Sequence, residues 1–140
     1  MIGPITHVPT VAQRKYLRKW ADNSFCVTAP DDFGVPEVRG YKPDPGTITA
    51  LSLKNVQPHD DPWVGKQPEP EGDDRRSVFW LVDFPENEIL YLQVGTEFKA
   101  MRRYEYVVFD DSVLHSVQAN RKWWGVAYQL RATNTALGAE

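Results

Sequence analysis

Two histidines and one carboxylate are the residues of this chain whose types and spacing point to chemistry. His59 and Asp61 follow an apolar segment and lie between Pro58 and Pro62. Residues i and i+2 of an extended chain point to the same side, so His59 and Asp61 can share one ligand site. His115 lies much later, in another apolar segment. Two His and one carboxylate leave the opposite positions of a metal open, as in the facial triad of non-haem Fe(II) oxygenases.

Other interpretations of these residues stay open. The run from His59 to Asp61 is also typical of a turn that an aspartate side chain caps. A single histidine such as His115 is often a hydrogen-bonded core residue or a surface residue. If the site binds a metal, His and Asp ligands accept manganese, nickel or zinc as well as iron.

One helix is well marked near the N-terminus. Thr10 and Gln13 have the spacing of a capping box, which predicts a helix over residues 11–21. This segment holds no Gly or Pro, and its apolar residues recur at helical spacing, with basic residues on the other side. We expect the helix to pack on a sheet. The segment before it, including His7, is expected to be loose, and we assign His7 no role.

The rest of the chain predicts short strands joined by turns. The predicted strands share β-branched and aromatic residues between turn signals, and they span about 47–56, 76–84, 89–94, 96–101, 104–109, 114–117 and 123–131. This succession predicts a β sandwich or barrel with the helix over an outer face or edge. We expect a single domain over 1–140, with the barrel at about 25–131 and a frayed tail at 132–140.

The last predicted strand has two different faces. One face presents small and polar residues as well as one large ring: Trp123, Gly125, Ala127, Gln129 and Arg131. Such a face leaves room for a ligand inside a barrel. Arg131 would point into the same space, where its guanidinium is suited to bind a carboxylate with two hydrogen bonds.

The composition is that of an ordinary globular domain, with 41% apolar and 25% charged residues. A net charge of −3 gives no indication of nucleic-acid binding. Cys26 is the only cysteine, so the chain can form no internal disulfide, which fits a reducing compartment. The N-terminus lacks the pattern of a signal peptide, and no apolar run is long enough for a membrane span. We therefore expect a cytoplasmic protein.

The segment 104–120 resembles the second metal-ligand motif of the cupin and Fe(II)/2-oxoglutarate dioxygenase superfamily. It is most similar to the aspartyl/asparaginyl β-hydroxylase branch, in which a Phe-Asp-Asp-Ser turn precedes a metal-binding His. The segment 58–62 is similar to the His-x-Asp motif of prolyl-hydroxylase type enzymes. The resemblance implies a mainly β, cupin-like jelly roll (a double-stranded β-helix) with one N-terminal helix. It also implies iron at His59, Asp61 and His115.

The resemblance further implies a site for 2-oxoglutarate. In the β-hydroxylase branch, an Arg that holds 2-oxoglutarate follows the second His, and Gly125 stands at that position here. We therefore expect Arg131, or Arg76, to hold the far carboxylate of 2-oxoglutarate. The predicted substrate pocket is formed by Trp63, Trp80, Tyr128 and Gln129.

Three functions follow from this reasoning, and we favour the first. It is an Fe(II)/2-oxoglutarate dioxygenase that hydroxylates a small molecule or a protein side chain. The second is a catalytically silent cupin-like protein that binds a ligand or a partner, which Gly125 and the small size favour. The third is an assembly protein whose aromatic surface is buried in a homodimer, in which case His59 and His115 would lie far apart.

Overall fold

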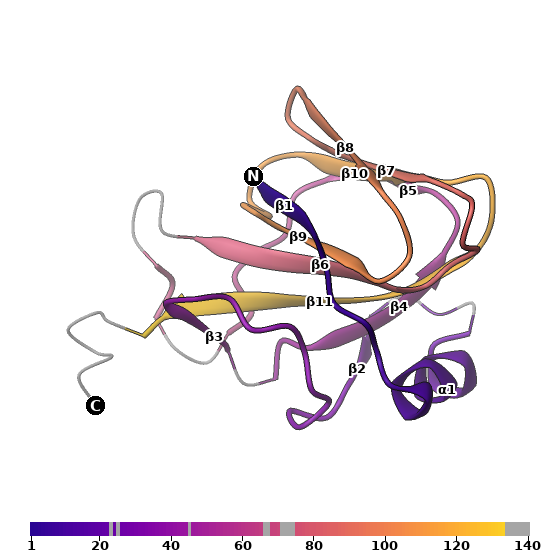
Figure 1. The fold of residues 1–140 in the computed structure, drawn as a ribbon. Coiled ribbons are helices and arrows are strands. Elements are labelled where there is room, and N and C mark those ends of the chain that lie inside the picture. Colours follow the sequence, from indigo (N-terminus) through magenta and orange to yellow (C-terminus); the bar gives the residue numbers. More distant parts are fainter. Residues whose placement is uncertain (23, 25, 45, 66–67, 71–74, 134–140) are drawn as a thin grey trace.

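The fold was analysed in a computed structural model of the chain. The structure describes residues 1–22, 24, 26–44, 46–65, 68–70 and 75–133. These residues form two antiparallel β sheets that face each other, and one helix lies outside the larger sheet (Figure 1). None of the helical structure in the described ranges is long and apolar enough to cross a membrane.

The strands divide between a larger and a smaller sheet. In spatial order, the larger sheet contains β1 (Ile2–Thr6), β9 (Glu105–Phe109), β6 (Arg76–Asp83), β11 (Trp123–Ala132), β4 (Thr49–Leu53) and β2 (Val27–Thr28), and β3 (Tyr41–Pro43) also pairs with β11. The smaller sheet contains β5 (Val56–His59), β10 (His115–Gln118), β7 (Leu90–Val94) and β8 (Glu97–Met101).

The order of the strands defines a jelly roll. The order β4-β11-β6-β9 in one sheet faces β5-β10-β7-β8 in the other, and neighbouring strands are antiparallel. The chain changes sheet at most connections, so strands distant in sequence become neighbours, as in the eight-stranded, two-sheet jelly roll of cupins. The predicted mainly β fold of this type, with one N-terminal helix, is confirmed.

The larger sheet is apolar on both faces. On β6, Phe79 and Leu81 point into the space between the two sheets, where they join one buried cluster. Val78, Trp80 and Val82 point to the opposite face and join a second cluster with residues of the helix. Burial on both sides explains why β6 reads as a continuous apolar run rather than an alternating pattern.

The helix α1 (Val11–Trp20) begins at the predicted capping box. The Gln13 N–H donates to Thr10 Oγ1 at 3.0 Å, and the Thr10 N–H donates to Gln13 Oε1 at 2.9 Å. Leu17 is fully buried against the outer face of the larger sheet. The Gln13 amide also donates to the carbonyls of Phe33 and Gly34, which ties the helix to the loop beside it.

Three boundaries differ from the sequence-based prediction. The segment expected to be loose forms β1 along β9, and the His7 carbonyl accepts a 3.0 Å hydrogen bond from Trp80 Nε1. The strand predicted over 47–56 is two strands, β4 and β5, because the chain turns from one sheet to the other between them. Strand β11 continues to Ala132, and residues 134–140 of the predicted frayed tail lie outside the described residues.

The contribution of the capping box to the stability of α1 can be tested directly. Thr10→Ala removes the side-chain oxygen that accepts from the helix N-terminus, and it should lower the free energy of unfolding by about 1 kcal/mol. Urea denaturation followed by circular dichroism measures the change. Thr96→Ala, in the exposed turn between β7 and β8, is the matched control and should leave the unfolding midpoint unchanged. Equal midpoints for the two variants would contradict the capping role.

Candidate metal centre

The two histidines stand opposite each other on neighbouring strands of the smaller sheet. His59 is the last residue of β5 and His115 is the first of β10, and the antiparallel register pairs them directly. Their ring centroids lie 4.2 Å apart. The ring of Phe109 packs edge-on against His115 at 5.1 Å between centroids, which restricts the rotation of that imidazole. The arrangement contradicts the expectation of the assembly hypothesis that the two histidines lie far apart.

Each imidazole is oriented by the backbone of its own strand. The Nδ1 atoms of His59 and His115 lie 2.8 Å from the carbonyl oxygens of Gln57 and Val113, respectively. A carbonyl only accepts hydrogen bonds, so we assign the proton of each neutral ring to Nδ1. Nε2 is then the atom with a free lone pair in both rings. A second hydrogen bond of this kind is what orients metal-binding histidines.

Asp61 completes the group. Its Oδ2 lies 3.1 Å from His115 Nε2, and its Oδ1 lies 3.5 Å from His59 Nε2. The three ligand atoms all lie within 4.8 Å of one another. A metal with bonds of about 2.1 Å separates neighbouring ligand atoms by about 3 to 3.5 Å. The separations of Asp61 from the two imidazoles fall in this range, so the three side chains predicted from the sequence are brought close enough together to hold a metal ion.

The electrostatics of the group favour a cation. Burial alone would raise the pKa of the Asp61 carboxyl, but the hydrogen bond from His115 and the charges of His115, His59 and Arg75 hold it below its ordinary value. Burial alone would lower the pKa of His115, but the hydrogen bond and charge of Asp61 and the Val113 carbonyl raise it. Positive charge between these side chains is thus stabilised, and a divalent cation places it there without a proton.

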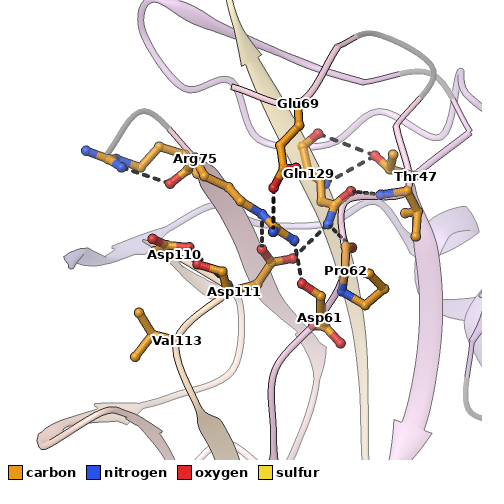
Figure 2. Close-up of polar contacts among 12 residues, drawn as sticks. Thr47, Asp61, Pro62, Glu69, Arg75, Asp110, Asp111, Val113 and Gln129 are labelled. Atoms are coloured by element: carbon orange, nitrogen blue, oxygen red, sulfur yellow. Dashed lines mark hydrogen bonds and ion pairs between the residues drawn. The ribbon is translucent and has the colours of Figure 1, made fainter. Parts of the chain in front are cut away.

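The segment that carries Asp61 lies outside the strands, and groups from distant parts of the chain hold its backbone (Figure 2). The Asp61 N–H donates to the Asp111 carbonyl at 2.8 Å. The Asp61 carbonyl accepts from Arg75 Nη2 at 2.5 Å. Both backbone groups of the residue that carries the carboxylate ligand are therefore fixed.

Gln129 on β11 holds the residues that follow. Its Nε2 donates to the Pro62 carbonyl at 2.9 Å and to Asp111 Oδ2 at 3.0 Å. Its Oε1 accepts from the Val64 N–H at 2.9 Å. The Gln129 backbone N–H in turn donates to Thr47 Oγ1 at 3.1 Å, as Figure 2 shows. The side-chain amide of Gln129 therefore holds the loop that follows Asp61 through hydrogen bonds.

Arg75 and Asp111 form a buried ion pair behind Asp61. Arg75 Nε lies 2.9 Å from Asp111 Oδ1, and the two residues are only 6% and 4% exposed. The Nε–H does not point along the line to the oxygen, so this contact is an ion pair without a well-aligned hydrogen bond. Burial raises the pKa of the Asp111 carboxyl, against the opposing effects of the Gln129 hydrogen bond and the Arg75 charge. Arg75 Nη1 also donates to Glu69 at 3.2 Å.

A cavity of about 290 Å³ lies between the sheets beside the three ligands. His59, Asp61 and His115 form part of its wall. Most of the remaining wall is apolar and comes from both sheets: Leu51, Val56, Phe79, Leu92, Phe109, Val117, Trp123 and Ala127. The face of β11 that the sequence assigned to the interior, with Trp123, Ala127 and Gln129, does line this cavity.

The residues predicted to form the substrate pocket do not share one place. Gln129 lines the cavity. Tyr128 also borders it, but its ring belongs to the cluster on the helix side of the larger sheet, and its hydroxyl donates to the Pro36 carbonyl at 2.9 Å. Trp80 belongs to the same outer cluster and does not line the cavity. Trp63 lies outside the wall, with its ring 5.9 Å from the Arg75 guanidinium.

The two arginines predicted to hold 2-oxoglutarate lie outside the cavity wall. Arg131 sits near the end of β11, in register with Lys42 of β3. Arg76 begins β6, and its Nη1 donates to the Arg75 carbonyl at 2.8 Å. A Cβ at Gly125 would lie 2.9 Å from the Phe79 ring and 3.0 Å from the Trp80 carbonyl, so this position has no room for an arginine.

Sequence reasoning missed Arg75 and Asp111, which hold the carboxylate ligand in place. Both residues stand at recognisable places in the sequence: Arg75 precedes a predicted strand, and Asp111 lies in the Phe-Asp-Asp-Ser turn. The only sequence signal was the pair of adjacent aspartates, since one aspartate is enough to cap a turn. Asp110 alone caps it, since Asp110 Oδ1 accepts from the N–H and the hydroxyl of Ser112 at 2.9 and 2.6 Å. The side chain of Asp111 is therefore not needed to cap the turn and can pair with Arg75 instead.

Comparisons with known proteins bear on the fold alone. No model of a protein family and no curated protein matches the chain. Among solved structures, the chain is similar to protein NMB1881 from Neisseria meningitidis, with 12% identity and a TM-score of 0.53 over 87% of this chain and 99% of that one. At this identity the likeness supports the two-sheet fold and says nothing of activity.

Two further structures are more distant. A cupin-2 domain containing protein from Shewanella frigidimarina shows 12% identity and a TM-score of 0.39, over 69% of this chain and 74% of that one. A variant of the salicylate 1,2-dioxygenase from Pseudoaminobacter salicylatoxidans shows 10% identity and a TM-score of 0.40, over 91% of this chain and 38% of that one. The predicted membership of the aspartyl/asparaginyl β-hydroxylase branch stays a prediction.

Replacing Arg75 tests how far the metal centre depends on the ion pair. Arg75→Met leaves the buried Asp111 without its counter-charge and the Asp61 carbonyl without its donor. We expect the free energy of unfolding to fall by about 3 kcal/mol, as for other broken buried pairs. The affinity for Co(II), measured by calorimetry below the unfolding transition, should fall about ten-fold to a hundred-fold.

Arg76→Met is the matched control, because Arg76 is the neighbouring arginine and lies outside the cavity wall. It should leave the Co(II) affinity unchanged. A fully folded Arg75→Met protein with the affinity of the Arg76→Met protein would show that Arg75 does not position Asp61.

Proposed function

We propose that this protein is a metal-dependent oxygenase in which His59, Asp61 and His115 hold one Fe(II) ion. The observation that supports this most strongly is the set of three ligand atoms, two imidazole nitrogens and one carboxylate, at the edge of an internal cavity. Three protein ligands leave coordination positions for O2 and a substrate. Iron bound there would supply the redox chemistry that the side chains of this chain cannot.

The residues of the chain have separate tasks in this proposal. The Gln57 and Val113 carbonyls keep both imidazoles in the tautomer that presents Nε2 to the metal. Asp61 supplies a negative charge that offsets part of the charge of the cation. The apolar walls from the two sheets exclude water from the reacting groups, which strengthens electrostatic interactions inside the site.

The arrangement of charges bears on the co-substrate. The resemblance implies 2-oxoglutarate, whose far carboxylate needs a cationic or strongly donating partner. Among the described residues that line the cavity, none is a lysine or an arginine, and both Arg76 and Arg131 lie elsewhere. We therefore favour an oxygenase whose organic substrate itself fills the cavity, with 2-oxoglutarate as the competing alternative to be tested.

Metal binding is the first test. His115→Ala should lower the affinity for Fe(II) or Co(II) at least about a hundred-fold, because two ligands seldom hold these ions in competition with water. Anaerobic calorimetry measures the affinity. His7→Ala is the matched control, since His7 packs against Trp80 on the other side of the larger sheet and should not affect metal binding. Equal affinities for the two variants would refute the metal centre and favour the silent binding protein.

The open coordination positions can be tested without knowledge of the substrate. Nitric oxide binds where O2 would bind, so the Fe(II)-loaded protein should give the electron paramagnetic resonance signal of a high-spin iron–nitrosyl complex. A protein that binds Fe(II) tightly without this signal would have no open position and would not be an oxygenase.

The role of 2-oxoglutarate has its own test. We expect the Fe(II)-loaded protein, supplied with O2, to form no succinate from 2-oxoglutarate above the level of the His115→Ala variant, because the described cavity wall offers no cation to the far carboxylate. Quantitative chromatography of succinate measures this. Succinate formation that Arg131→Met or Arg76→Met abolished would instead establish the co-substrate site implied by the resemblance.

A further inference from the structure

The part of the cavity beyond the metal ligands is lined mainly by hydrocarbon. Leu51 and the Trp123 ring line it from the larger sheet, and Val56, Leu92 and Val117 line it from the smaller sheet. Phe79 and Trp123 pack edge to face at 5.2 Å between centroids, which makes this wall rigid. Transfer of apolar surface into such a space is favourable, whereas a polar group there loses its hydration.

Several polar side chains of the wall are already hydrogen-bonded to other groups of the protein. The Thr47 hydroxyl donates to the Asp44 carbonyl at 2.8 Å and accepts from the Gln129 N–H, and the Thr49 hydroxyl donates to the Thr47 carbonyl at 2.9 Å. The Gln129 amide is bonded to the loop that carries Asp61 and to Asp111. These groups offer little to a ligand that needs several hydrogen bonds.

The charges of the described wall have one sign. Asp61 and Asp111 contribute carboxylates, and the cation that pairs with Asp111, Arg75, lies behind the wall rather than in it. A ligand carboxylate away from the metal would enter an apolar space without a counter-ion. A ligand ammonium group would meet carboxylates that already have partners, since Asp61 contacts His115 and Asp111 is paired with Arg75. A metal held by the three ligands would therefore be the strongest polar partner that the described wall offers to an anionic or neutral oxygen.

The size of the cavity sets a further limit. Pockets for drug-sized ligands measure about 300 to 1,000 Å³, so a volume of about 290 Å³ suits a small molecule of one or two rings or a short branched chain. The cavity lies between the two sheets of the jelly roll, which favours a free small molecule over a side chain of a folded protein.

We infer that the substrate is a small, predominantly apolar molecule with one metal-binding oxygen at one end and no charged group at the other. This rests on the proposed metal centre for the oxygen end, while the apolar end rests on the cavity wall alone. The inference narrows the substrate class: it argues against dicarboxylates and against any ligand with a charged group at the end away from the metal, and it favours a free small molecule over a protein side chain.

A pair of matched probes tests it. 2-Naphthol and 6-hydroxy-2-naphthoate share the ring system and the hydroxyl, and they differ in one distant carboxylate. Equilibrium dialysis should show that the metal-free protein binds 2-naphthol at least about ten-fold more tightly than the carboxylate, because that carboxylate must lose its hydration. Loading with Co(II) should tighten the binding of 2-naphthol, since the hydroxyl then has a metal partner.

Variants at Ala127 test whether the two probes bind inside the cavity. Ala127 lies on the cavity wall, between Thr49 and Phe79 in the register of β11 with its neighbours. Ala127→Lys adds a cation that can reach the distant carboxylate, so the preference should shift toward 6-hydroxy-2-naphthoate by at least about ten-fold. Ala127→Met is the matched control of similar length without charge, and it should keep the preference for 2-naphthol.

The outcomes separate the two proposals. Preference for 2-naphthol without any effect of bound Co(II) would support the apolar cavity and overturn the part of the inference that places the hydroxyl on the metal. Preference for 2-naphthol in a protein that binds no Co(II) would support the apolar cavity and refute the metal centre. Tight Co(II) binding with equal or stronger binding of 6-hydroxy-2-naphthoate to the unmodified chain would overturn the inference on substrate class and leave the metal centre standing. A preference that Ala127→Lys failed to shift would show that the probes bind outside the cavity, which also overturns the inference.

Discussion

The buried ion pair between Arg75 and Asp111 fixes the relative positions of the segments that carry the proposed metal ligands. Asp111 lies four residues before His115, and its carbonyl accepts from the Asp61 N–H. Arg75, just before β6, donates to the Asp61 carbonyl. Two charges that are both almost fully buried contribute little net stability, because desolvation offsets most of their attraction. We attribute their presence to geometry: they set the carboxylate ligand at the correct distance from two imidazoles that the strand register already places.

The outer face of the larger sheet accounts for the positions of Trp80 and Tyr128. The helix α1 and nearby loop residues supply an apolar layer for the outer face of this sheet, so Trp80 and Tyr128 find burial there together with hydrogen bonds to backbone carbonyls. The inner face carries smaller residues at Gly125 and Ala127, opposite the small sheet. The space beside Gly125 is filled by the Phe79 ring, whereas Ala127 borders the cavity. The small side chain of Ala127 therefore leaves room for the cavity on the inner face of β11.

Much of the fold and the three proposed metal ligands could be predicted from the sequence, but little of what holds those residues in place could be. Thr10 and Gln13 mark the start of the helix through a local hydrogen-bond pattern, which makes it readable from four residues. The alternation on β11 gave the interior face correctly at Trp123 and Gln129. A strand buried on both sides, such as β6, has no polar alternation, so the pattern could not say which face meets the cavity, and the expected pocket residue Trp80 lies in the outer cluster. The ion pair was unreadable for another reason: Arg75 and Asp111 meet only through the tertiary fold, and each alone resembles a surface charge.

The charges around the candidate centre would also restrict what binds to a metal held there. A divalent ion held there, with neutral imidazoles at His59 and His115, the carboxylates of Asp61 and Asp111 and the guanidinium of Arg75, would leave a single formal positive charge among the groups at the site. Glu69, which also pairs with Arg75, has a side chain that is 57% exposed, so water screens most of its charge. One anionic oxygen on the metal would neutralise the single formal positive charge. A second anionic group would carry an excess negative charge into a wall of hydrocarbon, where the low dielectric makes an unpaired charge costly. The same ion pair that holds Asp61 therefore also sets the charge balance, and it favours a ligand with one anionic end and a neutral remainder.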